Sequence, residues 1–305
     1  MAMSDRNSKT NVILGLVKEI GISLALSIFR KMCMIRFFEE GLINAVKNNQ
    51  IKYPLYLSRG QEAIPSALSL IIPDFAIFAQ HRCHGTYLAF DGDPVKLRDE
   101  LLGLPSGTSR GRAGSNCLQY HDKNITMFGH HGLIGENVPL AVGYALGTKK
   151  NTVCFFGDGA AEEDYVFAAM GFAVTHSLPV LFICEDNDLS ILTPVKDRRS
   201  WNLSAVAKAL GIQAVEIADD PWTIYKTAQD FRGKAPAFIN IFTCRANWHV
   251  GVGVDAPPEW DRFALVKEEL EKLGLANDIK NIEDTEKEVM AKIWDKEQLR
   301  ILLGK

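Results

Sequence analysis

Two short apolar runs, Val153–Phe156 and Val180–Cys184, are separated by a stretch with helical spacing of apolar residues, about Glu162–Thr175. A crossover of this length between two strands is right-handed and sets the strands parallel. Parallel strands end at the same edge of a sheet, where open α/β folds bind ligands. We therefore expect Asp158 and Asn187, which follow the two runs, to lie close together at that edge.

The same alternation of apolar runs and amphipathic stretches extends along most of the chain. Further strands are expected at 75–80, 212–217 and 237–243, and further helices at 12–49, 61–72, 137–147 and 221–230. This order predicts an α/β fold, with a parallel sheet that carries helices on both faces. We expect one domain over 1–305, with an N-terminal helical arm (about 1–50) and a C-terminal helical tail (about 258–305), broken near 274–278.

The segment 102–135 is polar, rich in glycine and without a clear apolar period. Irregular segments of this length inside a compact domain are usually functional. A disordered linker is the alternative, and apolar residues such as Leu118, Met127 and Phe128 within the segment weigh against it. In the following helix, small residues recur four positions apart, as in Ala141 and Ala145, and this spacing lets another helix approach, within the chain or across a subunit interface.

Composition narrows the class of protein. The chain has 305 residues, 47% of them hydrophobic, and a net charge of −3 from 34 basic and 37 acidic side chains. This charge does not suggest a nucleic-acid or anionic-membrane partner. The six cysteines form no CxxC pair, Lys18 and Glu19 interrupt the apolar run 12–29, and the N-terminus resembles no signal or transit peptide. These features favour a cytoplasmic protein.

Asp158 and Asn187 offer one carboxylate oxygen and one amide oxygen, which are hard ligands suited to Mg²⁺ with a phosphorylated cofactor. The glycines on either side of Asp158 allow the backbone to approach a ligand closely. We expect Gly159 and Ala160 to open the next helix, whose free N–H groups and dipole favour a diphosphate. The acidic residues in its first turn, 162–164, are interpreted as complementing that dipole.

Basic side chains follow two other predicted strands. His81 and Arg82 come after 75–80, and His249 comes after 237–243. Arginine presents a fork of donors to phosphate oxygens, and histidine can donate a hydrogen bond and later move a proton. The pair His130–His131 invites a transition-metal interpretation, but no further ligand has suitable spacing.

GDG at 157–159, followed about 30 residues later by Asn187, resembles the thiamine-diphosphate fingerprint. More specifically, about 24–275 resembles the alpha subunit of the thiamine-dependent component of 2-oxo acid dehydrogenases, a family that includes pyruvate, branched-chain and acetoin dehydrogenases. The segments that carry the resemblance are Ile35–Glu40, Ser58–Ala63, His81–Gly85, Gly132–Gly135, Gly157–Ala161, Asn187–Pro194 and Thr243–His249.

The resemblance implies roles for individual residues. Asp158, the Asn187 side chain and the Leu189 carbonyl would bind Mg²⁺. His249 would also act in catalysis, with His81 beside it. The cofactor, thiamine diphosphate, would be held by both of these histidines and by the metal ligands, and the remaining contacts would come from Arg82, Gly132, Ile134, Gly159, Ala160 and Ile191.

The resemblance also implies partners. In this family a glutamate of a separate beta subunit completes the active site, so we expect an α₂β₂ heterotetramer that decarboxylates a 2-oxo acid and passes the fragment to a lipoyl group on an acyltransferase core. Three departures stand out: Asp186 replaces a usual asparagine, Val250 replaces a phosphorylated serine and so excludes kinase control there, and the loop 110–121 is altered.

The altered loop keeps a non-oxidative thiamine-dependent carboligase or decarboxylase subunit open as an alternative. A nucleotide-binding Rossmann protein would need a G-x-G-x-x-G after a first strand, which the chain lacks. A non-catalytic scaffold subunit is the third alternative, and the intact Asp158, Asn187, Arg82 and His249 argue against it.

Overall fold

A seven-stranded sheet forms the centre of the protein. The structure, a computed structural model, describes residues 15–122, 125–254 and 258–295, together with 299, 301, 302 and 304. The strand order is β2-β3-β1-β4-β5-β9-β8, and every pair is parallel except β2 with β3. The strands are β1 (Ala76–Phe78), β2 (Tyr120–His121), β3 (Thr126–Phe128), β4 (Thr152–Gly157), β5 (Val180–Asp186), β8 (Gln213–Ala218) and β9 (Ala237–Phe242).

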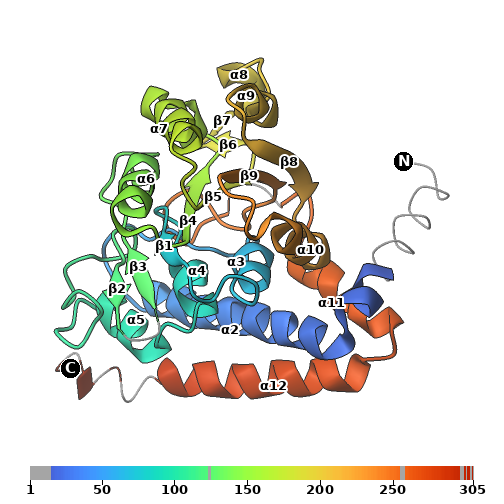
Figure 1. The fold of residues 1–305 in the computed structure, drawn as a ribbon. Coiled ribbons are helices and arrows are strands. Elements are labelled where there is room, and N and C mark those ends of the chain that lie inside the picture. Colours follow the sequence, from blue (N-terminus) through green and yellow to red (C-terminus); the bar gives the residue numbers. More distant parts are fainter. Residues whose placement is uncertain are drawn as a thin grey trace.

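Helices cover both faces of the sheet, and a small hairpin follows β5 (Figure 1). The helices are α2 (Ile22–Lys47), α3 (Ala63–Leu68), α4 (His84–Ala89), α5 (Pro94–Leu101), α6 (Asn137–Thr148), α7 (Asp164–Thr175), α8 (Val195–Arg198), α9 (Leu203–Ala209), α10 (Pro221–Phe231), α11 (Arg262–Lys272) and α12 (Ala276–Ile293), with a 3₁₀ turn η1 (Ala160–Glu162). The hairpin pairs β6 (Leu189–Ser190) with β7 (Thr193–Pro194).

Side chains that alternate along β4 separate two cores. Val153 and Phe155 pack on the face covered by α2, α3, α4 and α10, whereas Cys154 and Phe156 pack on the face covered by α6, α7 and α9. Successive strand residues point to opposite faces, so a strand buried on both faces reads as a continuous apolar run. The predicted parallel sheet with helices on both faces is confirmed.

The N-terminal and C-terminal helices pack together. Figure 1 shows α2 and α12 side by side along one side of the molecule, and the two helices are in direct contact. Thirteen residues of α2 are buried, so this helix belongs to the core. The predicted first helix began at residue 12, and residues 12–14 lie outside the described part. No helix in that part is both long and apolar enough to cross a membrane.

Local sequence explains where α10 begins and how it is held. Asp220 precedes the helix and accepts a hydrogen bond from the Thr223 N–H at 2.9 Å, and Pro221 occupies the first helical position. Both are favourable at a helix start. Trp222 is fully buried and donates from its indole nitrogen to Glu269 of α11 at 2.8 Å. The strand 212–217, the helix 221–230 and the strand 237–243 are confirmed with small shifts in their bounds.

The segment 102–135 is more ordered than predicted. It contains β2 and β3, and β3 pairs with β1 inside the main sheet, so the expectation of an irregular segment throughout was wrong at 120–121 and 126–128. The loop before β2 is fixed by Glu100, which is completely buried. Its carboxylate accepts four backbone hydrogen bonds, from Ser109, Gly111, Ala113 and Gly114, at 2.7–3.2 Å.

Candidate cofactor and metal site

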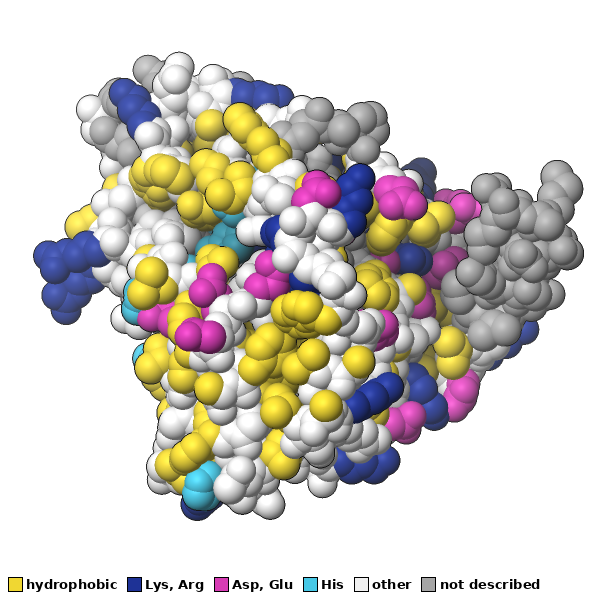
Figure 2. Space-filling model, turned by 90° about the horizontal axis from the view of Figure 1, so that it is seen from above, with side chains coloured by type: hydrophobic (Ala, Val, Ile, Leu, Met, Phe, Trp, Pro, Cys, Tyr) yellow, Lys and Arg dark blue, Asp and Glu magenta, His cyan; other side chains and the backbone are white. Residues whose placement is uncertain are grey.

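A cavity of about 170 Å³ opens at the carboxyl ends of β1, β3, β4 and β5. Figure 2 looks onto this end of the molecule and shows histidine side chains in a recess bordered by hydrophobic and charged side chains. Most of the site residues predicted from the sequence line this cavity. They are His81, Arg82, Ile134, Asp158, Gly159, Ala160, Asn187, Leu189, Ile191 and His249.

Asp158 and Asn187 meet at this edge, as the crossover predicted. In the register of β4 and β5, Gly157 lies opposite Glu185, so the residues that follow the two strands emerge together. The Asn187 side chain is oriented by a hydrogen bond from its nitrogen to Gln61 (3.1 Å), while its oxygen accepts from the Leu189 N–H (3.2 Å). The Asn187 side chain is thus held in place, and it lines the same cavity as the buried carboxylate of Asp158.

The electrostatics of Asp158 suit a cation. The residue is 1% exposed. Burial and the negative charge of Asp186 raise the pKa of Asp158 to about 6, despite the opposing effect of Arg198. A nearby positive charge favours the ionised form of a buried carboxylate. The pair Asp158 and Asn187 therefore fits a hard divalent cation such as Mg²⁺.

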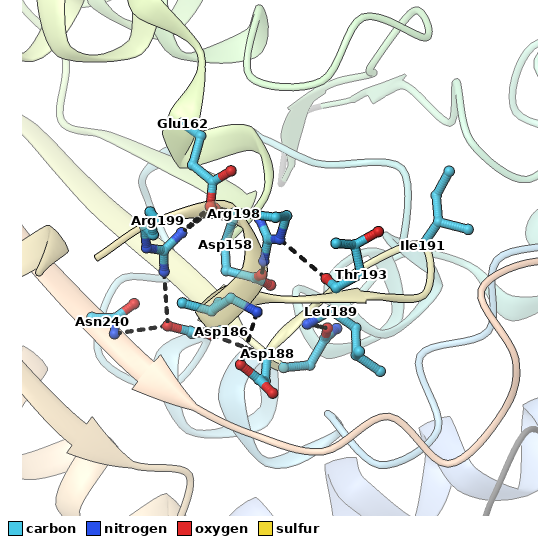
Figure 3. Close-up of polar contacts among 12 residues, drawn as sticks. Asp158, Glu162, Asp186, Asp188, Leu189, Ile191, Thr193, Arg198, Arg199 and Asn240 are labelled. Atoms are coloured by element: carbon cyan, nitrogen blue, oxygen red, sulfur yellow. Dashed lines mark hydrogen bonds and ion pairs between the residues drawn. The ribbon is translucent and has the colours of Figure 1, made fainter. Parts of the chain in front are cut away.

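Two arginines that sequence reasoning missed lie beside Asp158 (Figure 3). Arg198 donates to the Asp158 carboxylate and to Glu162. Arg199 donates to the Asp158 carbonyl at 2.9 Å and to Glu162. Glu162 therefore pairs with two arginines, and its interpretation as only a complement to the helix dipole was wrong. No spacing in the sequence signals this, because the β6–β7 hairpin turns the chain back toward β4.

Asp186, one of the departures from the family, is held in a polar network. Its carboxylate accepts from the Asp188 N–H (3.1 Å) and from the Asn240 side chain (3.2 Å), and it lies 3.6 Å from the Arg199 guanidinium. Figure 3 shows Asp186 with Asn240 and Arg199 at one carboxylate oxygen and Asp188 at the other. The extra negative charge beside the metal pair is thus partly balanced by Arg199.

His81, Arg82 and His249 come together although they follow different strands. Arg82 is buried and donates to the carbonyls of Leu57 (2.6 Å) and His249 (3.4 Å). Burial and the Arg245 charge lower the pKa of Arg82 to about 10. The rings of His81 and His249 lie 5.4 Å apart. Burial, then the charges of Arg82 and His249, lower the pKa of His81, so its imidazole is neutral at physiological pH.

The backbone around Gly159 forms a close wall of the cavity. A Cβ atom at Gly159 would lie 2.7 Å from the Ser190 hydroxyl, so only glycine fits there. The following helix differs from its prediction: Ala160 opens the short 3₁₀ turn η1, and α7 begins only at Asp164. The prediction that Gly159 and Ala160 open a helix whose dipole favours a diphosphate was therefore wrong, because α7 does not start there.

Gly132 and Ile191 take different positions. Gly132 is not among the residues that line the cavity, and its N–H donates to the His130 ring at 3.0 Å. Ile191 lines the cavity with φ +54°, which is a strained conformation for a β-branched residue.

Within the described residues, no group of three or more His, Cys, Asp or Glu is placed to hold a metal.

An α/β sheet that carries an acid–amide pair and basic residues at its carboxyl edge offers ligands for a divalent cation and a diphosphate. The family model "Dehydrogenase E1 component" matches residues 30–298, and the chain belongs to that family. This confirms the predicted family of thiamine-diphosphate-dependent, metal-using 2-oxo acid decarboxylating components, at the level of the alpha subunit.

Curated relatives agree with this assignment. The chain is 34% identical to pyruvate dehydrogenase E1 component subunit alpha-1, mitochondrial, of Oryza sativa subsp. japonica, over 53% of the chain and 43% of the relative. It is 31% identical to the alpha subunit of Zymomonas mobilis pyruvate dehydrogenase E1 over 73% of the chain and 67% of that protein. It is 29% identical to the alpha subunit of Bacillus subtilis acetoin:2,6-dichlorophenolindophenol oxidoreductase, over 77% of the chain and 75% of that protein.

Solved structures show the same fold. A transketolase from Leishmania mexicana superposes with a TM-score of 0.56 at 16% identity, over 92% of this chain and 46% of that one. The chain thus spans about half of the transketolase. The thiamine-diphosphate-binding fold predicted from the sequence is confirmed.

Proposed function

We propose that this chain is the alpha subunit of an enzyme that decarboxylates a 2-oxo acid and transfers the acyl fragment to a lipoyl group, working as an α₂β₂ heterotetramer with a beta subunit. The observation that carries the proposal is the convergence of Asp158, Asn187, Arg82 and His249 on one cavity. Relatives named as pyruvate dehydrogenase E1 components support a 2-oxo acid as the substrate.

In this proposal Asp158, the Asn187 side chain and the Leu189 carbonyl hold Mg²⁺, and Arg82 and His249 contact the diphosphate. Bound thiamine diphosphate supplies the nucleophilic carbon and the electron sink for decarboxylation. His81 acts as a neutral hydrogen-bonding group, and His249 moves protons near the reacting atoms. Remaining contacts to the cofactor are assigned to Gly132, Ile134, Gly159, Ala160 and Ile191.

The walls of the cavity would limit the access of water. Ile134, Phe156 and Leu189 contribute apolar surface beside the charged groups. Exclusion of water strengthens electrostatic interactions at the reacting atoms. Gly159 allows the backbone to come close to the diphosphate, because a side chain there would collide with Ser190.

The surroundings of the cavity support a partner subunit. Ile191 lines the cavity and is 58% exposed, and the large hydrophobic side chains of Leu133, Leu192 and Trp248, each next to a lining residue in the sequence, are 45–63% exposed. Hydrophobic groups exposed together commonly mark an interaction site. We assign this surface to the beta subunit, which would close the cavity and supply the groups that this chain lacks.

A reconstitution experiment tests the proposal. The chain with its beta subunit is expected to decarboxylate at least one member of a panel of 2-oxo acids with an artificial electron acceptor, whereas the isolated chain is inactive. A second series with aldehydes as acceptors tests the carboligase alternative. Substantial turnover by the isolated chain, or activity that requires an aldehyde, would contradict the proposal.

The proposal includes a cytoplasmic location, which the six free cysteines support, since a reducing compartment keeps thiols free. The rice relative is named as mitochondrial, so the compartment needs its own test. Cell fractionation followed by immunodetection is expected to find the chain in the cytoplasmic fraction, and recovery from another compartment would contradict this part of the proposal.

A further inference from the structure

His130, at the end of β3, carries a buried hydrogen-bond donor without a partner. The residue is 3% exposed. Its Nδ1 atom accepts a hydrogen bond from the Gly132 N–H at 3.0 Å. A neutral imidazole that accepts at Nδ1 carries its proton on Nε2. Within the part of the chain that the structure describes, the buried Nε2 atom has no hydrogen-bond partner.

The surroundings keep this ring uncharged. Protonation of Nδ1 would set two N–H groups, those of His130 and Gly132, against each other. Burial and the neighbouring His131 also lower the pKa of His130, despite a smaller opposing interaction with the Leu133 backbone. The side chain therefore presents a neutral donor and does not supply a positive charge.

His130 lies at the end of the cavity remote from the metal pair. In the sheet, β1 separates β3 from β4, and adjacent strands are about 4.8 Å apart, so the ends of β3 and β4 are roughly 10 Å apart. The ring of His81 lies between, 6.0 Å from His130 and 5.4 Å from His249. The metal pair thus lies at the β4 and β5 end of the cavity, and the imidazoles of His81 and His130 lie at its β1 and β3 end.

A buried donor that pairs with nothing destabilises the protein, and a ligand oxygen at this position would remove that cost. The metal pair, Arg82 and His249 would hold the diphosphate on the far side of His81, so the reactive part of the cofactor and the substrate would lie on the His130 side. The oxygens of a 2-oxo acid, on its carboxylate and its carbonyl, are acceptors that match a neutral N–H group.

We propose that His130 binds the substrate, by donating a hydrogen bond from Nε2 to an oxygen of the 2-oxo acid. This inference rests on the proposed function and adds a substrate-binding residue to it. A metal role for the three imidazoles is not supported, because no group of three ligands in the described chain is placed to hold a metal.

Three substitutions in the complex with the beta subunit test the proposal. His130→Leu removes the donor, His130→Asn keeps a polar group but not a donor at the Nε2 position, and His130→Gln places an amide N–H close to that position. We expect kcat/KM for the 2-oxo acid to fall about 10-fold to 100-fold in the Leu and Asn variants and to recover to within about threefold in the Gln variant. His176→Gln, on the exposed end of α7, is the matched control with unchanged kcat/KM.

The dissociation constant of thiamine diphosphate, measured by calorimetry on the same proteins, separates the explanations. The proposal expects it to stay within about twofold of wild type in all variants. Unchanged kcat/KM in the Asn variant would overturn the proposal, and so would a loss of cofactor affinity that parallels the loss of kcat/KM. If the wild-type complex binds the cofactor but turns over no 2-oxo acid, the proposed function fails first and this inference fails with it.

Discussion

Arg198 of α8 donates a hydrogen bond to the carboxylate of Asp158, the residue that we assign to Mg²⁺. The Arg198 side chain is 11% exposed and that of Asp158 is 2% exposed, so the ion pair is largely shielded from water. A positive charge at this place balances a carboxylate whose burial would otherwise disfavour ionisation. Arg198 and a metal ion therefore compete for the same oxygen atoms.

Removal of Arg198 is expected to strengthen metal binding. In the isolated chain without cofactor, Arg198→Gln should lower the dissociation constant of Mg²⁺ about tenfold, which corresponds to about 1.4 kcal/mol, because the metal no longer displaces a guanidinium. Isothermal titration with MgCl₂ measures this. Lys196→Gln, an exposed change on the same helix, serves as the control. Weaker Mg²⁺ binding in the Arg198 variant would show that the two cations do not compete.

The carboxylate of Glu100 is expected to hold the loop 107–114 in place. Glu100→Gln replaces one acceptor oxygen with a donor that faces two backbone N–H groups, and should lower the free energy of unfolding by about 2–4 kcal/mol. Urea denaturation measures the loss of stability, and limited proteolysis with cleavage mapping checks whether the loop 107–114 has been released. Glu288→Gln, in an exposed ion pair, should change stability by less than about 0.5 kcal/mol. Equal stability of the two variants would refute this role.

Gly135, which lines the cavity, and Gly143, inside α6, are expected to respond oppositely to substitution by alanine. Gly135 has φ +81°, and a Cβ atom there would lie 2.8 Å from Val166 and 2.9 Å from the Ala160 carbonyl. Gly135→Ala should destabilise the chain by about 1–3 kcal/mol. Gly143 lies inside α6 with open space around it, so Gly143→Ala should stabilise by about 0.5–1 kcal/mol. Thermal unfolding of both variants tests these opposite changes in stability. An unchanged stability of Gly135→Ala would contradict the prediction.

Stability of the cofactor-free chain is expected to fall in mildly acidic solution. The folded pKa of His81 is lowered by burial and by Arg82 and His249, so below pH 6.5 the unfolded chain binds a proton that the folded chain does not. Each such group removes up to about 1.4 kcal/mol of stability per pH unit below 6.5, and none above about pH 7.5. Urea denaturation at several pH values between 5 and 8 should show that the free energy of unfolding changes less steeply with pH in His81→Phe than in wild type. An unchanged slope would argue against a buried neutral His81.

The central part of the fold was predictable because its strands contain long apolar runs, which are visible in a short stretch of sequence. Strands β4 and β5 have six and seven residues, all but one of them buried, and each contains an uninterrupted apolar run, Val153–Phe156 and Val180–Cys184. The crossover between them then places Asp158 beside Asn187 with no further information. By contrast, β3 has three residues, of which only Met127 is buried, and its pairing with β1 involves residues some fifty positions apart.

The parts of the site that the sequence does not reveal depend on long-range contacts. Glu100 lies on a short amphipathic helix and resembles a solvent-exposed acid until the backbone N–H groups of the following loop surround it. Arg198 reaches Asp158 across 40 residues because of the β6–β7 hairpin. His130 was noticed only as a possible metal ligand, since periodicity cannot show that Gly132 fixes its tautomer.

The binding of thiamine diphosphate in the presence of Mg²⁺ tests the central claim most directly. Calorimetry on the chain with its beta subunit should show binding by wild type, loss of binding with EDTA, and affinity reduced by about 100-fold or more in Asp158→Ala. Circular dichroism should show that this variant keeps its fold. Unchanged affinity in a folded Asp158→Ala complex would contradict the assignment of Asp158 and Asn187 to the metal.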